Sequence, residues 1–225
     1  MKRAIGARDA AIFADLVKFR ALTNEFIWKR HASHLKYNAV VKITGRLVRQ
    51  QWLVKYPLFE RYVYFLAGTK LLKLHGGKPS QSEPLGPQAL AMSIALLNLC
   101  SQQLQINLVD PTCWPTELAW LPKKMRGVRV LVSKDPEFGE LLLARTDLGG
   151  SAEHVAKKCS QDIARRMQLP AFNVAVKQQQ VRFVVLTVNE IKAERIRHQI
   201  NKRDWPIGLR FRIHLVPELI HFIGQ

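Results

Sequence analysis

Side chains that can hydrogen-bond to DNA recur within residues 36–51 at steps of three and four residues: Asn38, Lys42, Arg46 and Arg49. Residues at such steps share one face of a helix. The opposite face of the same segment is apolar: Val40, Ile43, Leu47 and Val48. Arg and Asn make the paired hydrogen bonds that distinguish guanine and adenine in the major groove, and Lys pairs with phosphate. The spacing therefore predicts a helix that buries one face and presents the other to duplex DNA.

The flanking segments extend this basic face. Lys36 and Tyr37 stand at the start of the predicted helix. Two β-favouring runs follow it, residues 52–56 and 62–66, and the five residues between them predict a hairpin. Lys55 and Arg61 belong to this hairpin, and we expect both to contact the DNA backbone beside the groove.

Two earlier helices are predicted to support the DNA-facing one. Apolar residues recur at helical spacing over Ala7–Phe19, and Thr23 can cap a second helix over Asn24–His31. Three helices followed by a hairpin predict a winged helix-turn-helix over residues 1–76. The alternative is that the basic face is only solvated and that the winged helix binds protein.

The net charge supports a nucleic-acid partner. The chain has 35 Lys and Arg against 17 Asp and Glu, a formal charge of +18. Residues 1–80 hold 16 of the basic residues and only 4 of the acids, so this third is the expected DNA face. Acidic membranes or acidic proteins are the other partners that charge alone allows. The sequence predicts neither a membrane span nor a signal peptide, and we expect a cytoplasmic protein.

The cysteines and histidines predict no metal site. The three cysteines, Cys100, Cys113 and Cys159, are widely spaced and form no CxxC pair, and no histidine lies in an HExxH frame. Buried thiols in a reducing compartment account for them. We expect no bound cofactor.

A run rich in Gly, Pro and Ser predicts a linker over residues 77–87. The remainder, residues 88–225, predicts a small α/β domain, so the chain as a whole belongs to the α+β class. An apolar helix over residues 88–102 is followed by strands at 105–109, 128–132 and 140–144 and a helix at 152–167. A strand at 181–188, a helix at 189–201 and a strand at 209–216 complete the domain.

This order of elements is that of the restriction-endonuclease-like fold, in which carboxylates on adjacent strands hold a catalytic metal. Here the strand at 128–132 has no acid, and the next strand ends at Asp147, the only candidate ligand there. Carboxylates in the neighbouring turn, Asp135, Glu137 and Glu140, could complete a metal site, but turn carboxylates are more often solvated or capping groups. We therefore expect no catalytic residues and no metal, with a metal-dependent nuclease as an alternative.

The chain resembles the plasmid replication-relaxation (MobC-type) family, in which a winged helix precedes a degraded nuclease-like domain. The resemblance covers residues 21–23, 45–53 and 64–69, and then residues 142–162 and 181–198. The family commonly reads Glu-x-Asp-x-Gly before a helix that bears a lysine. This chain instead has Arg145, Asp147 and Gly149, followed by Lys157 and Lys158.

The resemblance implies an accessory protein of a mobile genetic element that binds duplex DNA near an origin of transfer or replication and assists a relaxase. Its partners would be double-stranded DNA and a relaxase or another protein encoded by the element. A transcriptional regulator of the same element, using the second domain for homodimer formation or effector sensing, is the alternative.

Overall fold

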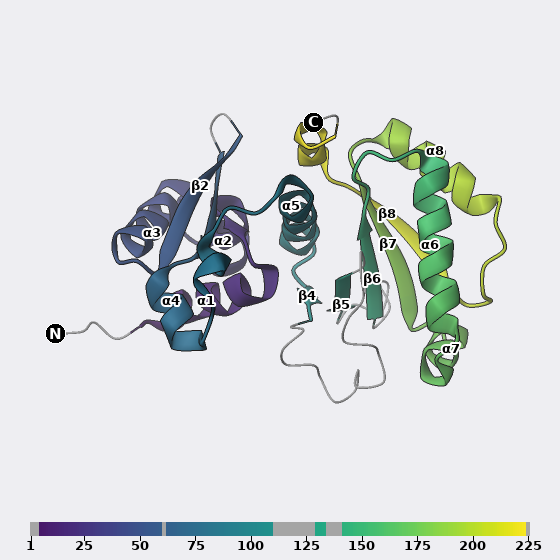
Figure 1. Cartoon of the computed structure of the whole chain (residues 1–225), viewed down its shortest axis with the longest axis horizontal. Helices are drawn as coiled ribbons and strands as arrows, with labels where there is room; N and C mark the ends of the chain where they lie inside the picture. Colours follow the sequence, from purple (N-terminus) through teal and green to yellow (C-terminus); the bar gives the residue numbers. More distant parts are fainter. Residues whose placement is uncertain (1–4, 60–61, 110–128, 134–140, 224–225) are drawn as a thin grey trace. The chain divides into compact units, whose positions relative to one another are not determined.

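The computed structural model describes residues 5–59, 62–109, 129–133 and 141–223. Its contacts divide the chain into two compact units, residues 1–104 and 105–225. Each unit combines helices with a β-sheet, which confirms the α+β class. Figure 1 labels the elements of both units.

The first unit opens with helices and a short strand. Helix α1 (Ala7–Phe19) precedes strand β1 (Leu22–Thr23) and helix α2 (Asn24–His31). The amide of Phe26 donates to Thr23 Oγ1 over 3.2 Å, which confirms the expected N-terminal cap of α2. Helix α3 (Tyr37–Arg49) follows and contacts α2.

A three-stranded antiparallel sheet completes this arrangement, in the order β1-β3-β2. Strand β2 (Leu53–Phe59) pairs with β3 (Tyr62–Ala67), as predicted for a hairpin. The strand runs through Pro57, where a loop was predicted, and its register shifts between Pro57 and Phe59. Proline is tolerated here because β2 is an edge strand of the sheet.

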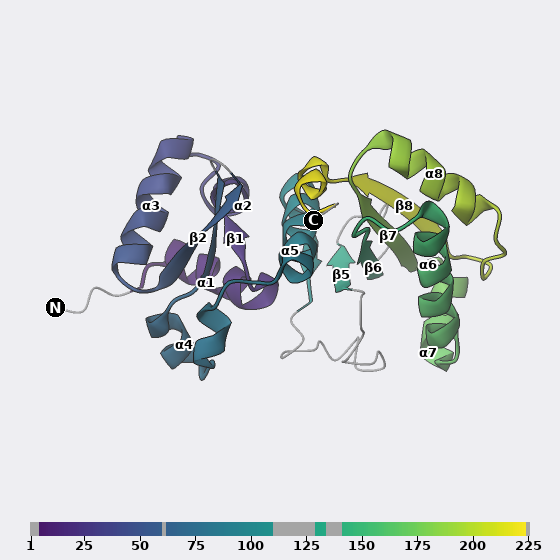
Figure 2. The same ribbon diagram turned by 45° about the horizontal axis from the view of Figure 1, so that its top comes forward.

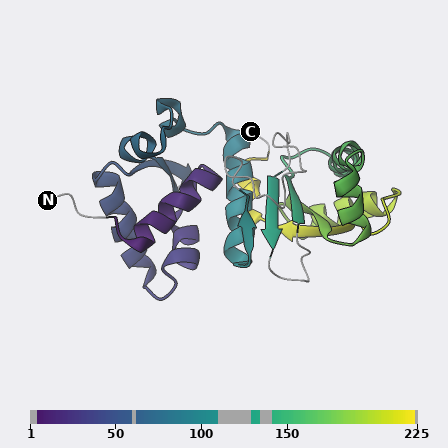
Figure 3. The same cartoon turned by 90° about the horizontal axis from the view of Figure 1, so that it is seen from below.

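The first unit extends further along the chain than the predicted boundary. Helix α4 (Thr69–His75) and a 3₁₀ turn, η1 (Pro79–Ser82), lead to helix α5 (Pro87–Gln102). Helix α5 contacts α1, α2 and β1, and Figures 1 and 3 show it beside the N-terminal helices. Contacts thus group α5 with residues 1–104, although we expected it in a domain over residues 88–225. The reason is that its apolar side chains cover the N-terminal helices.

The second unit is built on a five-stranded mixed sheet in the order β4-β5-β6-β7-β8. Strand β5 (Arg129–Ser133) pairs antiparallel with both of its neighbours, β4 (Ile106–Leu108) and β6 (Leu141–Thr146). Strands β6, β7 (Val181–Thr187) and β8 (Arg210–Leu215) are parallel. The turn that carries Asp135, Glu137 and Glu140 lies outside the described residues.

Helices cross from one parallel strand to the next. Helix α6 (Ala152–Met167) and helix α7 (Pro170–Lys177) link β6 to β7, and helix α8 (Glu190–Asn201) links β7 to β8. Figure 2 shows α6 and α8 on one face of the sheet. Their apolar sides pack on that face, where Leu143, Cys159, Phe172, Phe183 and Ile196 are fully buried or nearly so.

Candidate nucleic-acid interface

Buried contacts fix the rotation of α3. Val40, Thr44 and Leu47 are at most 1% exposed and lie on one side of the helix. The Thr44 hydroxyl lies 2.9 Å from Asn24 Oδ1 on α2 and 3.2 Å from the Val40 carbonyl oxygen. A hydroxyl that bonds back to its own helix needs no solvent and can be buried. These contacts hold the opposite side of α3 toward solvent.

The solvent side of α3 carries most of the predicted DNA-contacting residues. Lys36, Tyr37, Asn38, Lys42 and Arg49 are all exposed. Among the residues that the structure describes, no acid forms an ion pair with Lys36, Lys42 or Arg49. Burial, followed by the charges of Glu25 and Tyr62, raises the pKa of Tyr37, so this phenol stays neutral at physiological pH.

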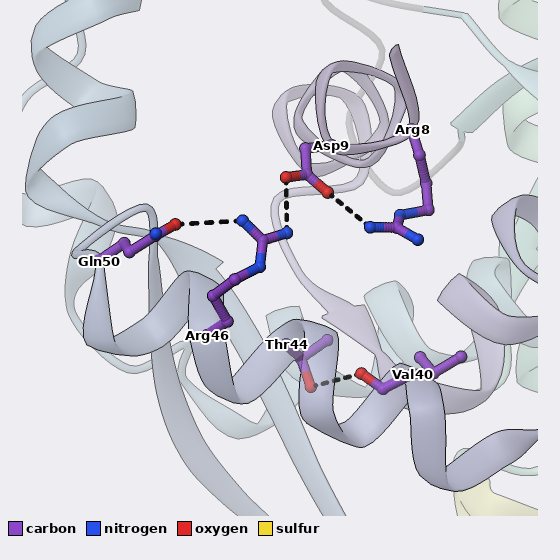
Figure 4. Close-up of polar contacts among 6 residues, drawn as sticks. All are labelled: Arg8, Asp9, Val40, Thr44, Arg46 and Gln50. Atoms are coloured by element: carbon purple, nitrogen blue, oxygen red, sulfur yellow. Dashed lines mark hydrogen bonds and ion pairs between the residues drawn. The ribbon is translucent and has the colours of Figure 1, made fainter. Parts of the chain in front are cut away.

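Arg46 was expected to face DNA with Lys42 and Arg49, but its guanidinium is bound within the unit. Its Nη2 atom donates to Asp9 Oδ2 on α1 over 2.7 Å, and its Nη1 atom donates to Gln50 Oε1 over 3.2 Å. Figure 4 shows the guanidinium between these two residues, with Arg8 on the other oxygen of Asp9. Arg46 therefore ties α3 to α1. To contact a base it would have to leave the Asp9 carboxylate.

The other acids of this unit are also engaged within it. Asp15 Oδ2 lies 3.0 Å from His31 Nε2 and 3.7 Å from Arg30 Nε. Glu25 pairs with Lys29 one turn along α2. Each acid that the structure describes in residues 1–80 thus has a basic partner: Arg46 of α3 for Asp9, and residues of α2 for Asp15 and Glu25. Within the described residues, none of these acids forms an ion pair with Lys36, Lys42 or Arg49.

The hairpin that follows α3 carries a further exposed basic residue. Residues two apart in a strand share a face, so Lys55 lies on the face of Leu53, which is buried. Lys55 itself is exposed beyond this buried part, and α3 contacts β2. Arg61, the other predicted hairpin contact, lies outside the described residues.

Asp147, the candidate metal ligand, is buried, and its carboxylate is hydrogen-bonded to protein groups. It is 1% exposed. Its Oδ2 atom accepts from Thr187 Oγ1 at 2.9 Å and its Oδ1 atom accepts from the amide of Gly149 at 3.0 Å. Lys192 Nζ lies 3.9 Å from Oδ2 and donates to the Gly150 carbonyl. This arrangement joins the ends of β6 and β7 to the start of α8, and both carboxylate oxygens already have partners.

Arg145 stands where the resembled family has glutamate, and it forms part of a buried ion cluster. Its guanidinium pairs with Asp162 on α6, and Arg166 Nη1 lies 3.6 Å from the other oxygen of Asp162. Burial, only partly opposed by Asp162, lowers the pKa of Arg166. Burial raises the pKa of the neighbouring Cys159 thiol to about 12. The cluster is positively charged and lacks the paired carboxylates of a metal-dependent nuclease.

No group of three or more His, Cys, Asp and Glu residues within the described ranges is close enough to hold a metal ion. No helix in these ranges is both long enough and apolar enough to cross a membrane. Comparisons with known proteins add no assignment. The chain matches no family model, no curated protein and no solved structure.

Two residues of the α3 face were not singled out from the sequence. Val41 is 44% exposed, although its residue type suggested a buried position. Gly45 lies between Val41 and Arg49 on the exposed side, and an added Cβ would have no heavy atom within 4 Å. The helical wheel centred on Asn38 could have identified both, because they stand three and seven residues beyond it.

Proposed function

We propose that the chain is a double-stranded DNA-binding protein, and that its first unit is a winged helix with α3 as the recognition helix. The observation that carries the proposal is the exposed basic face of α3, on which Lys36, Lys42 and Arg49 are exposed and have no acidic partner in the described part of the unit. A solvated face of mixed charge would be expected to place acids beside its lysines.

The elements around α3 support the same proposal. A recognition helix is followed by a hairpin that contacts the DNA backbone beside the major groove. Here β2 and β3 follow α3 directly, and Lys55 on β2 is exposed. Phosphate contacts from Lys36, Lys42 and Lys55 would position the helix, and Asn38 and Arg49 would contact base edges.

Binding measurements across salt concentration test the proposal. Alanine at Lys42 should weaken duplex binding and reduce the slope of log K against log salt by about 0.9, the value for one lost phosphate contact on B-DNA. Arg49→Ala should weaken binding by about 1–3 kcal/mol if the guanidinium forms a paired contact with a base.

The control variants separate contact from charge. Lys73→Ala removes an exposed lysine from α4 and should leave binding nearly unchanged. Arg46→Ala should lower the stability of the first unit, because the buried Asp9 then loses the closer of its two basic partners, and should weaken binding as a consequence. Wild-type affinity and salt slope in both Lys42→Ala and Arg49→Ala would contradict the proposal.

The resemblance to the replication-relaxation family extends the proposal to a cellular role. We infer a site near an origin of transfer or replication, where the second unit contacts a relaxase. A transcriptional regulator would use the same α3 face at a promoter. Recovery and mapping of the DNA bound to the chain in cells separates the two, because the recovered fragments would contain either an origin or a promoter.

A further inference from the structure

An uncharged strip of three residues, Asn38, Val41 and Gly45, runs along the exposed face of α3. Asn38, Val41 and Gly45 follow one another at helical steps of three and four residues, so they lie along one line on the exposed side. Val41 is 44% exposed, and the position of Gly45 is open beyond its backbone. Lys42 and Arg49 flank the strip. This order places a methyl-bearing side chain and bare backbone at the centre of a cationic surface.

The stability of the fold does not account for the residue type at either Val41 or Gly45. A valine with nearly half of its surface exposed contributes little to the core, and β-branched side chains are poorer helix formers than alanine. Glycine inside a helix costs about 0.5–1 kcal/mol relative to alanine. Gly45 is the one glycine inside an α-helix of the described ranges, and no neighbouring atom requires it. A partner that approaches the helix closely accounts for both choices.

Base edges in the major groove differ in what they offer such a strip. Thymine alone among the four presents a methyl group there, and adenine presents the N7 and N6 pair that Asn binds with two hydrogen bonds. A guanine or cytosine edge would instead place a polar group against the Val41 methyls. Absence of a side chain at Gly45 allows the helix axis to lie nearer the groove floor.

We propose that this strip reads A·T base pairs, with Val41 against a thymine methyl and Asn38 on an adenine. The proposal rests on the DNA-binding function above and adds the sequence class of its site. Val41 and Asn38 are then specificity residues, whereas Lys36, Lys42 and Lys55 supply affinity that does not depend on sequence.

The test begins with selection of a binding site from a random duplex library by the full chain. The recovered site should contain A·T pairs at its centre. Each thymine is then replaced singly by deoxyuridine, which removes only the methyl group. Loss of one methyl contact should weaken wild-type binding about four-fold at one thymine or more, from the usual value of a buried methylene. The same replacement should leave the affinity of Val41→Ala unchanged.

Asn38 is tested with 7-deazaadenine, which lacks the N7 acceptor. This replacement should weaken the wild type at one adenine and have no effect on Asn38→Ala, whose own affinity should be lower by roughly 5- to 150-fold. Val17→Ala, an exposed valine on α1 with 38% of its surface accessible, is the matched control and should respond to deoxyuridine as the wild type does.

The outcomes separate this inference from the function on which it rests. A recovered site without A·T pairs, or a wild type indifferent to every deoxyuridine, would overturn the A·T assignment while leaving DNA binding in place. A deoxyuridine effect that persists in Val41→Ala would also overturn it. Failure of the chain to retain any duplex at low salt would instead refute the proposed function.

Discussion

His214 is a buried titratable side chain in the second unit. It lies on β8 and is 8% exposed. Burial, and then the charge of Arg212, lowers its pKa to about 4. The folded state therefore resists protonation of this imidazole at pH values where the unfolded chain takes up the proton.

The pH dependence of stability follows from this shift. Well above pH 6.5, His214 is neutral in both states and contributes nothing to a pH dependence. As pH falls from 6.5 toward 4, the unfolded chain binds the proton first, so stability falls. The loss between pH 8 and pH 5 is about 2 kcal/mol for a pKa of about 4 against 6.5. We expect urea unfolding of His214→Gln to show a smaller loss over this range than the wild type.

The comparison with the wild type is essential, because other groups titrate over the same range. An equal loss of stability in the wild type and in His214→Gln would show that the imidazole is not held neutral by the fold. The same conclusion would follow if the variant melted at a lower temperature than the wild type at every pH while its stability changed with pH as steeply as that of the wild type.

At the scale of the element, the buried side of α3 serves stability, whereas its exposed side contains a residue that lowers helix stability. Its buried side must fix its rotation, which Thr44 achieves through Asn24 and the Val40 carbonyl. Its exposed side retains a glycine at a position where alanine would favour the helix. A conflict of this kind between stability and local sequence is expected where a surface binds a partner.

Gly45→Ala should therefore separate stability from binding. The free energy of unfolding should rise by about 0.5–1 kcal/mol, since alanine is the better helix former and the new methyl meets no atom within 4 Å. Duplex binding should weaken, because the methyl stands where DNA approaches α3. Denaturant titration and anisotropy with the same preparation measure both effects.

Gly86→Ala is the matched control for this substitution. An added Cβ at Gly86 also meets nothing within 4 Å, but the residue precedes α5 rather than lying on α3. It should leave duplex affinity unchanged. Tighter or equal binding by Gly45→Ala would argue against close approach of DNA to this helix.

At the scale of the molecule, both units contain buried acids that are paired with basic residues. Asp9 and Asp15 are such acids in the first unit, and Asp147 and Asp162 in the second. We expect the acids of the second unit to have a structural role and not to bind a metal. The carboxylate oxygens of Asp147, for example, already accept hydrogen bonds from protein groups.

The purified chain should accordingly not cleave supercoiled plasmid in Mg²⁺ or Mn²⁺, as judged from the loss of supercoiled DNA on a gel. Asp147→Ala, prepared in parallel, shows whether any nicking comes from a contaminant, which would act equally in both samples. Metal-dependent nicking by the wild type that disappears in Asp147→Ala would place the nuclease alternative first.

The sequence by itself determined the elements whose signals are local. Apolar spacing and the Thr23 cap predicted α1 and α2 at the residues where they occur. The placement of apolar and basic residues at helical steps predicted which side of α3 is exposed. Helix α7 was missed, although Pro170 at its first turn and the spacing of Phe172, Ala175 and Val176 are local helix signals. Strand β1 has only two residues and exists through its pairing with β3.

Tertiary structure decided the partners of the charged residues and the place of α5. Arg46 meets Asp9 from 37 residues away, and Asp147 meets Thr187 from 40 residues away. Such pairs depend on how helices and strands pack, which residue spacing along one element does not encode. The apolar surface of α5 likewise predicted burial but not which helices it would cover, because hydrophobic attraction has no direction.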